Sequence, residues 1–260
     1  DNGAGRIGLT WKPAAHWTTR FITSYEYSNQ GGYPYGLYNA DKGTTEAVNY
    51  NNEGLYRRNL LTSGINIRYN GPHISFNSQT SYQYIQDKMG IDQDFSPRNI
   101  FYGQNKIRQH MYCQEFTVKS VNKSRYHWIT GAFVFRQTIN RKVDLSRFTD
   151  TTRHLTNSGI PTQGIAFYHQ STLDLLQGLS CSVGLRYDYE HARCDFSKVQ
   201  QPLNGNGETK SLEQFNRSLH FGQFTPRFSM QYLSSHNQLF YASVSKGYKA
   251  GGFNVSFLNN

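Results

Sequence analysis

The residues that could do chemistry are scattered along the 260-residue chain rather than gathered into motifs. The nearest approach to an acid–base set comprises Asp87, Asp92, Asp94 and His110. Carboxylates on loops are far more often solvated than catalytic. The glycine pair at 251–252 lacks the Lys-Ser/Thr sequence and the following helix of a phosphate-binding loop. No catalytic residue is assigned, and we do not expect an enzyme.

Metal and nucleic-acid chemistry are equally poorly supported. The three cysteines form no Cys-x-x-Cys pair and the nine histidines form no His-Glu-x-x-His motif, so no metal ligand or cofactor is expected. The formal net charge is +10, but a nucleic-acid-binding protein gathers its bases into a patch or stripe. Here the arginines fall singly, one per predicted strand: Arg6, Arg20, Arg68, Arg186 and Arg227. We therefore expect no nucleic-acid partner.

Two polar segments offer ligand-binding chemistry, and both are expected in loops. Residues 31–38 read Gly-Gly-Tyr-Pro-Tyr-Gly-Leu-Tyr and present aromatic side chains, whereas the segment from 141 to about 155 presents positive charge suited to an anionic chelate. The candidate residues are Tyr33, Tyr35, Tyr38, Arg141, Arg147 and Arg153. An equally good interpretation is that they are interface tyrosines and loop charges facing lipopolysaccharide.

The elements that must position these residues have a two-residue period. From 179 to 190 the odd positions are Leu, Cys, Val, Leu, Tyr and Tyr, and the even ones are Ser, Ser, Gly, Arg, Asp and Glu. This alternation predicts strands with one apolar and one polar face. We predict ten of them, at 5–12, 16–28, 59–70, 73–87, 103–121, 125–140, 162–175, 178–194, 218–233 and 237–250.

Composition favours a membrane-spanning sheet. Aromatic residues make up 15% and charged residues 17%, while the mean hydropathy of −0.69 is hydrophilic, as expected when half of each strand faces lipid and half a polar lumen. No apolar run reaches the roughly 18 residues of a transmembrane helix. The predicted fold is therefore all-β, an antiparallel up-and-down transmembrane β-barrel.

Connections and aromatic residues predict the two ends of this sheet. Short turns alternate with long polar loops at about 29–58, 88–102, 141–161 and 195–217. In outer-membrane barrels the short turns are periplasmic and the long loops extracellular, so we expect the same here. Aromatic residues near both ends predict two interfacial belts. The residues expected on the convex face are Phe21, Ile67, Phe76, Val183, Leu185, Phe224 and Phe228. Those expected on the concave face are Arg20, Arg68, Arg186 and Arg227.

The run at 241–254, Tyr-Ala-Ser-Val-Ser-Lys-Gly-Tyr-Lys-Ala-Gly-Gly-Phe-Asn, resembles a barrel strand and its following loop in TonB-dependent receptors of the ferric-siderophore type. Its most specific residues are Lys246, Gly247, Tyr248, Lys249, Gly251, Gly252, Phe253 and Asn254. Segments 128–133, 179–189 and 224–227 are similar to other strands of that family, in the same order.

The resemblance implies a bacterial outer-membrane barrel of 22 strands with an N-terminal plug inside it. Such a receptor binds its substrate outside the cell and imports it with energy relayed by TonB. We therefore expect residues 1–260 to be about ten of those strands, an open fragment without the plug or the C-terminal strands. The implied partners are outer-membrane lipid and lipopolysaccharide, the plug and through it TonB, and a ferric-siderophore-like ligand.

Two alternatives make different predictions. A self-contained ten-stranded outer-membrane barrel, a protease or an adhesin, requires strands 5–12 and 237–250 to pair and close the sheet. A soluble all-β binding protein requires polar residues at the positions assigned to lipid.

Overall fold

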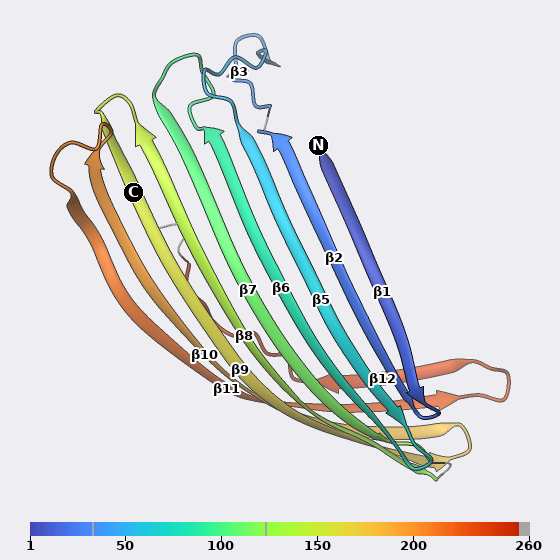
Figure 1. Cartoon of the computed structure of the whole chain (residues 1–260). Helices are drawn as coiled ribbons and strands as arrows, with labels where there is room; N and C mark the ends of the chain where they lie inside the picture. The colour runs from blue at the N-terminus through green and yellow to red at the C-terminus, as the bar shows by residue number, and fades with distance from the viewer. Residues whose placement is uncertain (33, 123, 255–260) are drawn as a thin grey trace.

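Ten strands form one antiparallel sheet in the computed structural model, which describes residues 1–32, 34–122 and 124–254 (Figure 1). Each strand pairs with its neighbour in sequence, in the order β1-β2-β5-β6-β7-β8-β9-β10-β11-β12. The strands are β1 (Asn2–Ala14), β2 (Trp17–Gly31), β5 (Leu55–Asn70), β6 (Ile74–Asp92), β7 (Phe101–Ser120), β8 (Tyr126–Arg147), β9 (Thr152–Leu176), β10 (Leu179–Pro202), β11 (Lys210–Leu233) and β12 (Leu239–Ser245). A small second sheet pairs β3 (Tyr38–Asn39) with β4 (Thr44–Thr45). The predicted up-and-down antiparallel fold is confirmed.

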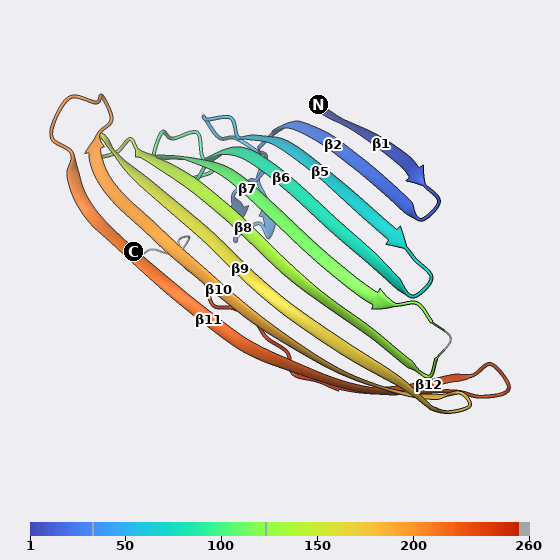
Figure 2. The same ribbon diagram turned by 60° about the horizontal axis from the view of Figure 1, so that its bottom comes forward.

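The ten-stranded sheet is open. Strands β1 and β12 occupy its two edges, and no backbone pairing joins them within the described residues (Figure 2). This confirms the expectation that strands 5–12 and 237–250 do not pair, and it counts against a self-contained ten-stranded barrel. No helix among the described residues is long and apolar enough to cross a membrane.

The register separates polar from apolar side chains, because directly opposite residues on neighbouring strands share a face. One transverse row, from β2 to β11, comprises Arg20, Asn66, Gln79, Glu115, Phe133, Ala166, Asp188 and Gln223. The adjacent row comprises Phe21, Ile65, Thr80, Gln114, Val134, Ile165, Tyr189 and Gly222. We call the face of the first row the polar face and that of the second the apolar face. The arginines and the apolar residues named above fall on these two faces as predicted.

The polar face is the inner side of the curved sheet. Side chains converge on the concave side of a curved sheet and bury one another, and they diverge on the convex side. Apart from Gly90 and Asp92 at the end of β6, the buried strand residues lie on the polar face: Ser75, Gly103, Ser158, Gly164, Ala166, Ser180, Ala192, Cys194 and Phe196. Large side chains on the apolar face stay exposed, among them Val183 at 58% and Phe224 at 56%.

The two ends of the sheet differ, but less than the sequence predicted. At the end that we call the turn end, the connections are 15–16, 71–73, 121–125, 177–178 and 234–238. At the other, the loop end, they are 32–54, 93–100, 148–151 and 203–209 (Figure 1). The predicted long loops at 141–161 and 195–217 are wrong, because the backbone ladder of β8 to β11 continues through most of both segments.

The long hairpins have a simple physical origin. Strands β8 to β11 contain 22, 25, 24 and 24 residues, whereas a tilted strand crosses a bilayer in about 9–11. Backbone hydrogen bonds continue the ladder past that length whatever the side-chain pattern. The predicted strand at 237–250 errs in the opposite direction: β12 ends at Ser245, where the chain leaves the sheet.

Candidate functional site

Two loops pack together at the loop end and present aromatic side chains. The backbone amide of Asn52 donates to Asp92 Oδ2 at 3.1 Å, and Asp92 is only 2% exposed. The Tyr35 and Phe95 rings meet edge to face with their centroids 5.1 Å apart. These contacts hold the loop 32–54 against the loop 93–100. Tyr35 and Tyr38 remain 50% and 68% exposed on this support, and Tyr33 lies outside the described residues.

Asp94 organises the second of these loops. Its carboxylate accepts hydrogen bonds from the hydroxyl of Ser96 at 2.5 Å and from the backbone amide of Phe101 at 3.0 Å. Burial tends to raise the pKa of Asp94, and the hydrogen bonds from Ser96 and Phe101 outweigh it, so the pKa lies below its ordinary value. The Asp94 carboxylate therefore holds the loop 93–100 in place and has a structural role.

The three candidate arginines do not form the single loop cluster expected from the sequence. Arg141 and Arg147 lie on the polar face of β8, whereas Arg153 lies on the apolar face of β9. Arg147 forms an ion pair with Asp150 at 3.4 Å, and Arg153 forms a two-pronged one with Asp144. Arg141 Nε donates to Asn105 Oδ1 at 3.0 Å. These side chains are strand residues with partners, so the prediction of a cationic loop is wrong.

His154 lies on the same hairpin, beyond the bilayer span. Burial lowers its pKa from the ordinary 6.5, and the positive charges of Lys198 and Arg147 lower it further. The hairpin therefore favours a neutral imidazole among cations.

A hydrogen-bonded network lines the polar face near the middle of the sheet. The Tyr168 hydroxyl donates to Glu115 Oε1 at 2.9 Å and lies 2.9 Å from the Thr117 hydroxyl. The Arg186 guanidinium lies 5.8 Å from the centroid of the Tyr168 ring and binds Asp188 through two nitrogens at 2.8–2.9 Å. The wall therefore satisfies much of its own charge.

A glycine of the similar segment 128–133 has a packing explanation. Gly131 pairs with Tyr168 across β8 and β9. A Cβ at Gly131 would overlap the Tyr168 ring and approach the carbonyl oxygen of Phe116 to 2.7 Å. Only glycine lets the tyrosine lie over the backbone and reach Glu115.

The other similar segment, Lys246 to Asn254, lies outside the strands. The Lys246 amide donates to the Pro226 carbonyl at 3.0 Å, after which the chain leaves the sheet. Gly251 contacts the Phe221 ring so closely that a Cβ would lie 2.7 Å from it. Since Phe221 lies on the polar face, the segment folds back over that face. The residues of this segment that carry the resemblance are Lys246, Gly247, Tyr248, Lys249, Gly251, Gly252, Phe253 and Asn254.

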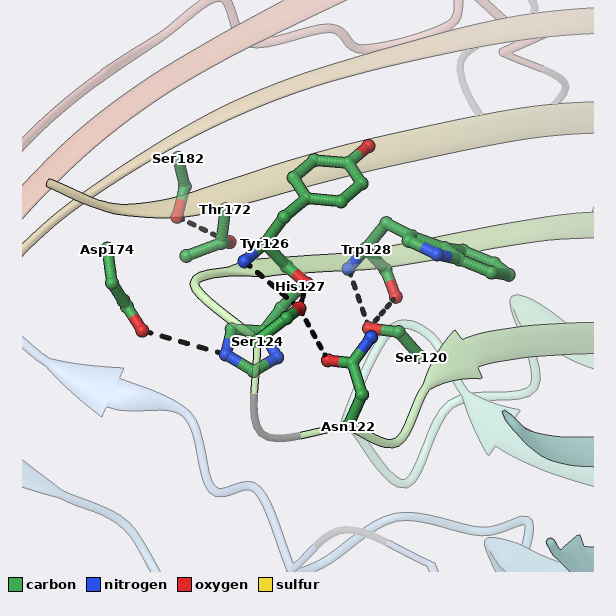
Figure 3. Close-up of polar contacts among 9 residues, drawn as sticks. All are labelled: Ser120, Asn122, Ser124, Tyr126, His127, Trp128, Thr172, Asp174 and Ser182. Carbon is green, nitrogen blue, oxygen red and sulfur yellow. Dashed lines mark hydrogen bonds and ion pairs between the residues drawn. The ribbon is translucent and has the colours of Figure 1, made fainter. Parts of the chain in front are cut away.

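Aromatic side chains mark the turn end of the apolar face. The Trp17 and Tyr69 rings pack with centroids 5.0 Å apart. Near the turn between β7 and β8, the Ser120 hydroxyl accepts a hydrogen bond from the Trp128 backbone amide at 2.9 Å (Figure 3). Tyr126 and Trp128 both project from the apolar face. The turn thus places two aromatic residues at the turn end of the apolar face.

A second aromatic band crosses the apolar face toward the loop end. Tyr82 bonds the His110 ring at 3.0 Å, and Tyr189 bonds the His220 ring at 3.0 Å. On β2 the interval from Trp17 to Tyr27 matches the about 9–11 residues of a membrane-crossing strand. The two bands therefore bound an apolar zone of bilayer thickness.

Among the described residues, the side chains considered for acid–base chemistry do not gather into one site. Asp87 pairs with Arg58 at 2.9 Å, Asp92 accepts from Asn52, Asp94 accepts from Ser96, and His110 bonds Tyr82. The four residues considered for acid–base work therefore each serve a different contact. The hydrogen bond that Arg58 donates to Asp87 is the main reason why the pKa of Arg58 is raised. No cluster of three or more metal-ligating side chains occurs among the described residues.

Comparison with known proteins agrees with this geometry. A family model described as "TonB dependent receptor-like, beta-barrel" matches residues 1–260. The structure is similar to the ferric yersiniabactin uptake receptor FyuA from Yersinia pestis, with a TM-score of 0.80 and 14% identity over 98% of this chain. It also resembles the ferric-catecholate import receptor Fiu from E. coli K12 (TM-score 0.63, 10% identity, 94% of this chain) and the siderophore receptor PiuA from Acinetobacter baumannii (0.62, 11%, 93%). The chain spans 38%, 52% and 42% of those three proteins.

Proposed function

The chain belongs to the TonB-dependent receptor β-barrel family of bacterial outer-membrane proteins, and on that basis we propose that it forms part of the wall of a receptor that imports a ferric-siderophore-like ligand. The observation that carries the proposal is the match of the family model to the whole chain. The names of the similar structures, which include a ferric yersiniabactin uptake receptor and a siderophore receptor, support the choice of ligand class.

The open sheet supports a larger barrel. Strands β1 and β12 each have one unpaired edge among the described residues, and an unpaired strand edge in hydrocarbon costs several kcal/mol per group. Further strands, including C-terminal ones, would complete the wall. A plug domain would face the polar side and connect the receptor to TonB, while lipid and lipopolysaccharide would face the apolar side.

Ligand recognition falls to the loop end in this proposal, because loops on a rigid frame carry binding. Tyr33, Tyr35 and Tyr38 are the stronger candidates, since Tyr35 and Tyr38 are exposed on a fixed support. Arg147 and Arg153 are neutralised by aspartates, and Arg141 bonds Asn105, so their contribution to an anionic ligand would be smaller.

The test uses the full-length receptor in cells. Tyr35→Ala/Tyr38→Ala should weaken binding of the radiolabelled iron chelate at least fivefold and leave the amount of inserted receptor unchanged. Tyr126→Ala, an exposed tyrosine at the opposite end, is the matched control and should bind as the wild type does. Uptake that persists without TonB would refute the importer, and unchanged binding by the double variant would move recognition to other loops.

A further inference from the structure

Four basic residues lie side by side in one transverse row of the apolar face. Arg57 on β5 pairs with Lys88 on β6, Lys88 with Lys106 on β7, and Lys106 with Lys142 on β8. Arg108 occupies the next row toward the turn end, between Gln86 and Asn140. We call these five residues the basic cluster. Directly opposite side chains have Cβ atoms about 4.5–5.5 Å apart, so each cation of the row stands within contact range of its neighbour.

The basic cluster has no acidic partner within the described residues. The ion pairs found among the described residues all involve bases outside the cluster: Arg58, His127, Arg147, Arg153, Arg186 and Arg193. Asp87 is the nearest carboxylate in sequence, but it faces the other side of the sheet and pairs with Arg58. Arg57 donates a hydrogen bond through Nε to Oδ1 of the neutral Asn29 at 2.9 Å. Like charges placed directly opposite destabilise a sheet, so this arrangement calls for an external anion.

The position of the basic cluster indicates which kind of anion could reach it. Tyr84 and His110 belong to the aromatic band and lie one row closer to the turn end than Arg108. Successive rows on one face are about 7 Å apart, so the basic cluster begins just beyond the interfacial belt and extends about 14 Å past it. The cluster lines a groove of about 670 Å³ together with Asn59, Gln86, Asp87, Ile107 and Asn140, and the Asp87 carboxylate there is paired with Arg58. This is the level of lipid headgroups, directly above the apolar zone.

We propose that the basic cluster binds the headgroup of an outer-leaflet lipid that carries two or more phosphates. Lysine and arginine offer several N–H donors each, and charge-assisted hydrogen bonds to phosphate oxygens are short and strong. The four-residue row spans about 14 Å across the strands, which exceeds one phosphate group. The acyl chains of such a lipid would lie on the apolar zone below, which a soluble anion could not use.

Lipopolysaccharide, a partner expected from the sequence, has this chemistry in its phosphorylated lipid anchor. The proposal rests on the outer-membrane location of the family and is independent of which ligand the receptor imports. The basic cluster is distinct from the candidate ligand-binding arginines, because Arg141, Arg147 and Arg153 are not members of it.

The test compares two triple variants of the full-length receptor that lose the same charge. Lys88→Gln/Lys106→Gln/Lys142→Gln removes three bases of the cluster. Arg20→Gln/Arg68→Gln/Lys119→Gln removes three bases from the polar face. Each protein is placed in phosphatidylcholine nanodiscs and titrated with bis-phosphorylated lipid A, with the same lipid after dephosphorylation, and with inorganic pyrophosphate.

Wild type and the polar-face variant should bind the bis-phosphorylated lipid equally, and the cluster variant at least tenfold more weakly. Dephosphorylation should weaken binding to the wild type by a similar factor, and added salt should reduce it. Equal loss in both variants, or equal binding of both lipids, would overturn the proposal. If pyrophosphate displaces the lipid at a concentration equal to the lipid's own, the proposal of a lipid site is wrong and the cluster is a site for soluble phosphates.

A stability measurement separates binding from folding. Without phosphorylated lipid, the cluster variant should unfold at the same or a higher denaturant concentration than the wild type, because three repelling charges are gone. A lower midpoint would assign the lysines a structural role and overturn the proposal. Both variants should bind the iron chelate as the wild type does, so a failure of the imported-ligand assignment would not be mistaken for a failure of the lipid site.

Discussion

The division of the sheet into two faces makes a sharp prediction at adjacent residues of β11. Phe228 lies on the apolar face, is 45% exposed, and pairs with Val183 and Val244. Phe228→Arg would therefore place a charge in lipid with no carboxylate beside it. Ser229→Arg, one residue away, would place the same charge on the polar face, opposite Ser182 and Ser243.

The depth of Phe228 sets the magnitude. Phe228 lies four residues from Tyr232, which stands on the same face at the turn end of β11. That separation is about 13 Å along a strand, or about 10 Å of depth at a 45° tilt. The apolar band of an outer-membrane barrel is about 25 Å tall, so this site is close to the midplane. Arginine there costs about 2–4 kcal/mol, which is a factor of roughly 30 to 700 in the unfolding equilibrium.

The assay is reversible unfolding of the full-length receptor in phosphatidylcholine vesicles, followed by tryptophan fluorescence. Phe228→Arg should lower the free energy of unfolding by the amount above, whereas Ser229→Arg should change it by less than about 1 kcal/mol, as for a polar surface site. The assignment of faces fails if the two variants lose equal stability, or if Ser229→Arg is the more damaging one.

Three further predictions concern packing, loop order and protonation. Gly131→Ala should destabilise the protein by about 1–3 kcal/mol through overpacking, and Tyr168→Ala should restore part of that loss in the same unfolding assay. Asp92→Ala should free the two loops that Asp92 joins, seen as faster amide hydrogen exchange in both while the strands stay protected. His154 should titrate below its ordinary 6.5 by NMR, and Lys198→Gln should raise its pKa without fully restoring it, because burial is the larger cause. Since the unfolded chain binds that proton more readily, the hairpin loses stability as the pH falls below about 6.5.

The sequence predicted the turn end of the sheet far better than the loop end. The strand predicted at 178–194 begins at Leu179, within one residue, but it extends to Pro202. Near the turns, lipid on one side and a polar lumen on the other enforce the alternation. Beyond the bilayer both faces meet water, so residues 141–144 show no separation of apolar from polar, although β8 continues through them. Only backbone pairing defines the strand there, and backbone pairing leaves no trace in side-chain type.

The candidate site was predictable only in part, for a related reason. The tyrosines of the segment 31–38 stood out because aromatic residues are conspicuous in a loop. The basic cluster did not, since each base is an ordinary polar residue within its own strand. Lys88, Lys106 and Lys142 become neighbours only when the register is known. The contact of Tyr168 with Glu115 likewise depends on strands 53 positions apart in sequence.

A single strand carries the orientation of the whole sheet. Along the apolar face of β7, from the turn end to the loop end, the side chains are Val118, Phe116, Gln114, Tyr112, His110, Arg108 and Lys106. Apart from Gln114, the order runs from the apolar Val118 and Phe116 through Tyr112 and His110 to Arg108 and Lys106, which follows the layers of a bilayer from hydrocarbon through interface to headgroup. The base nearest the turn end of β7, Lys119, lies on the polar face instead. The lipid site that we propose lies at the loop end of this sheet, and the two faces and two ends of β7 together define the orientation in the outer membrane that this proposal requires.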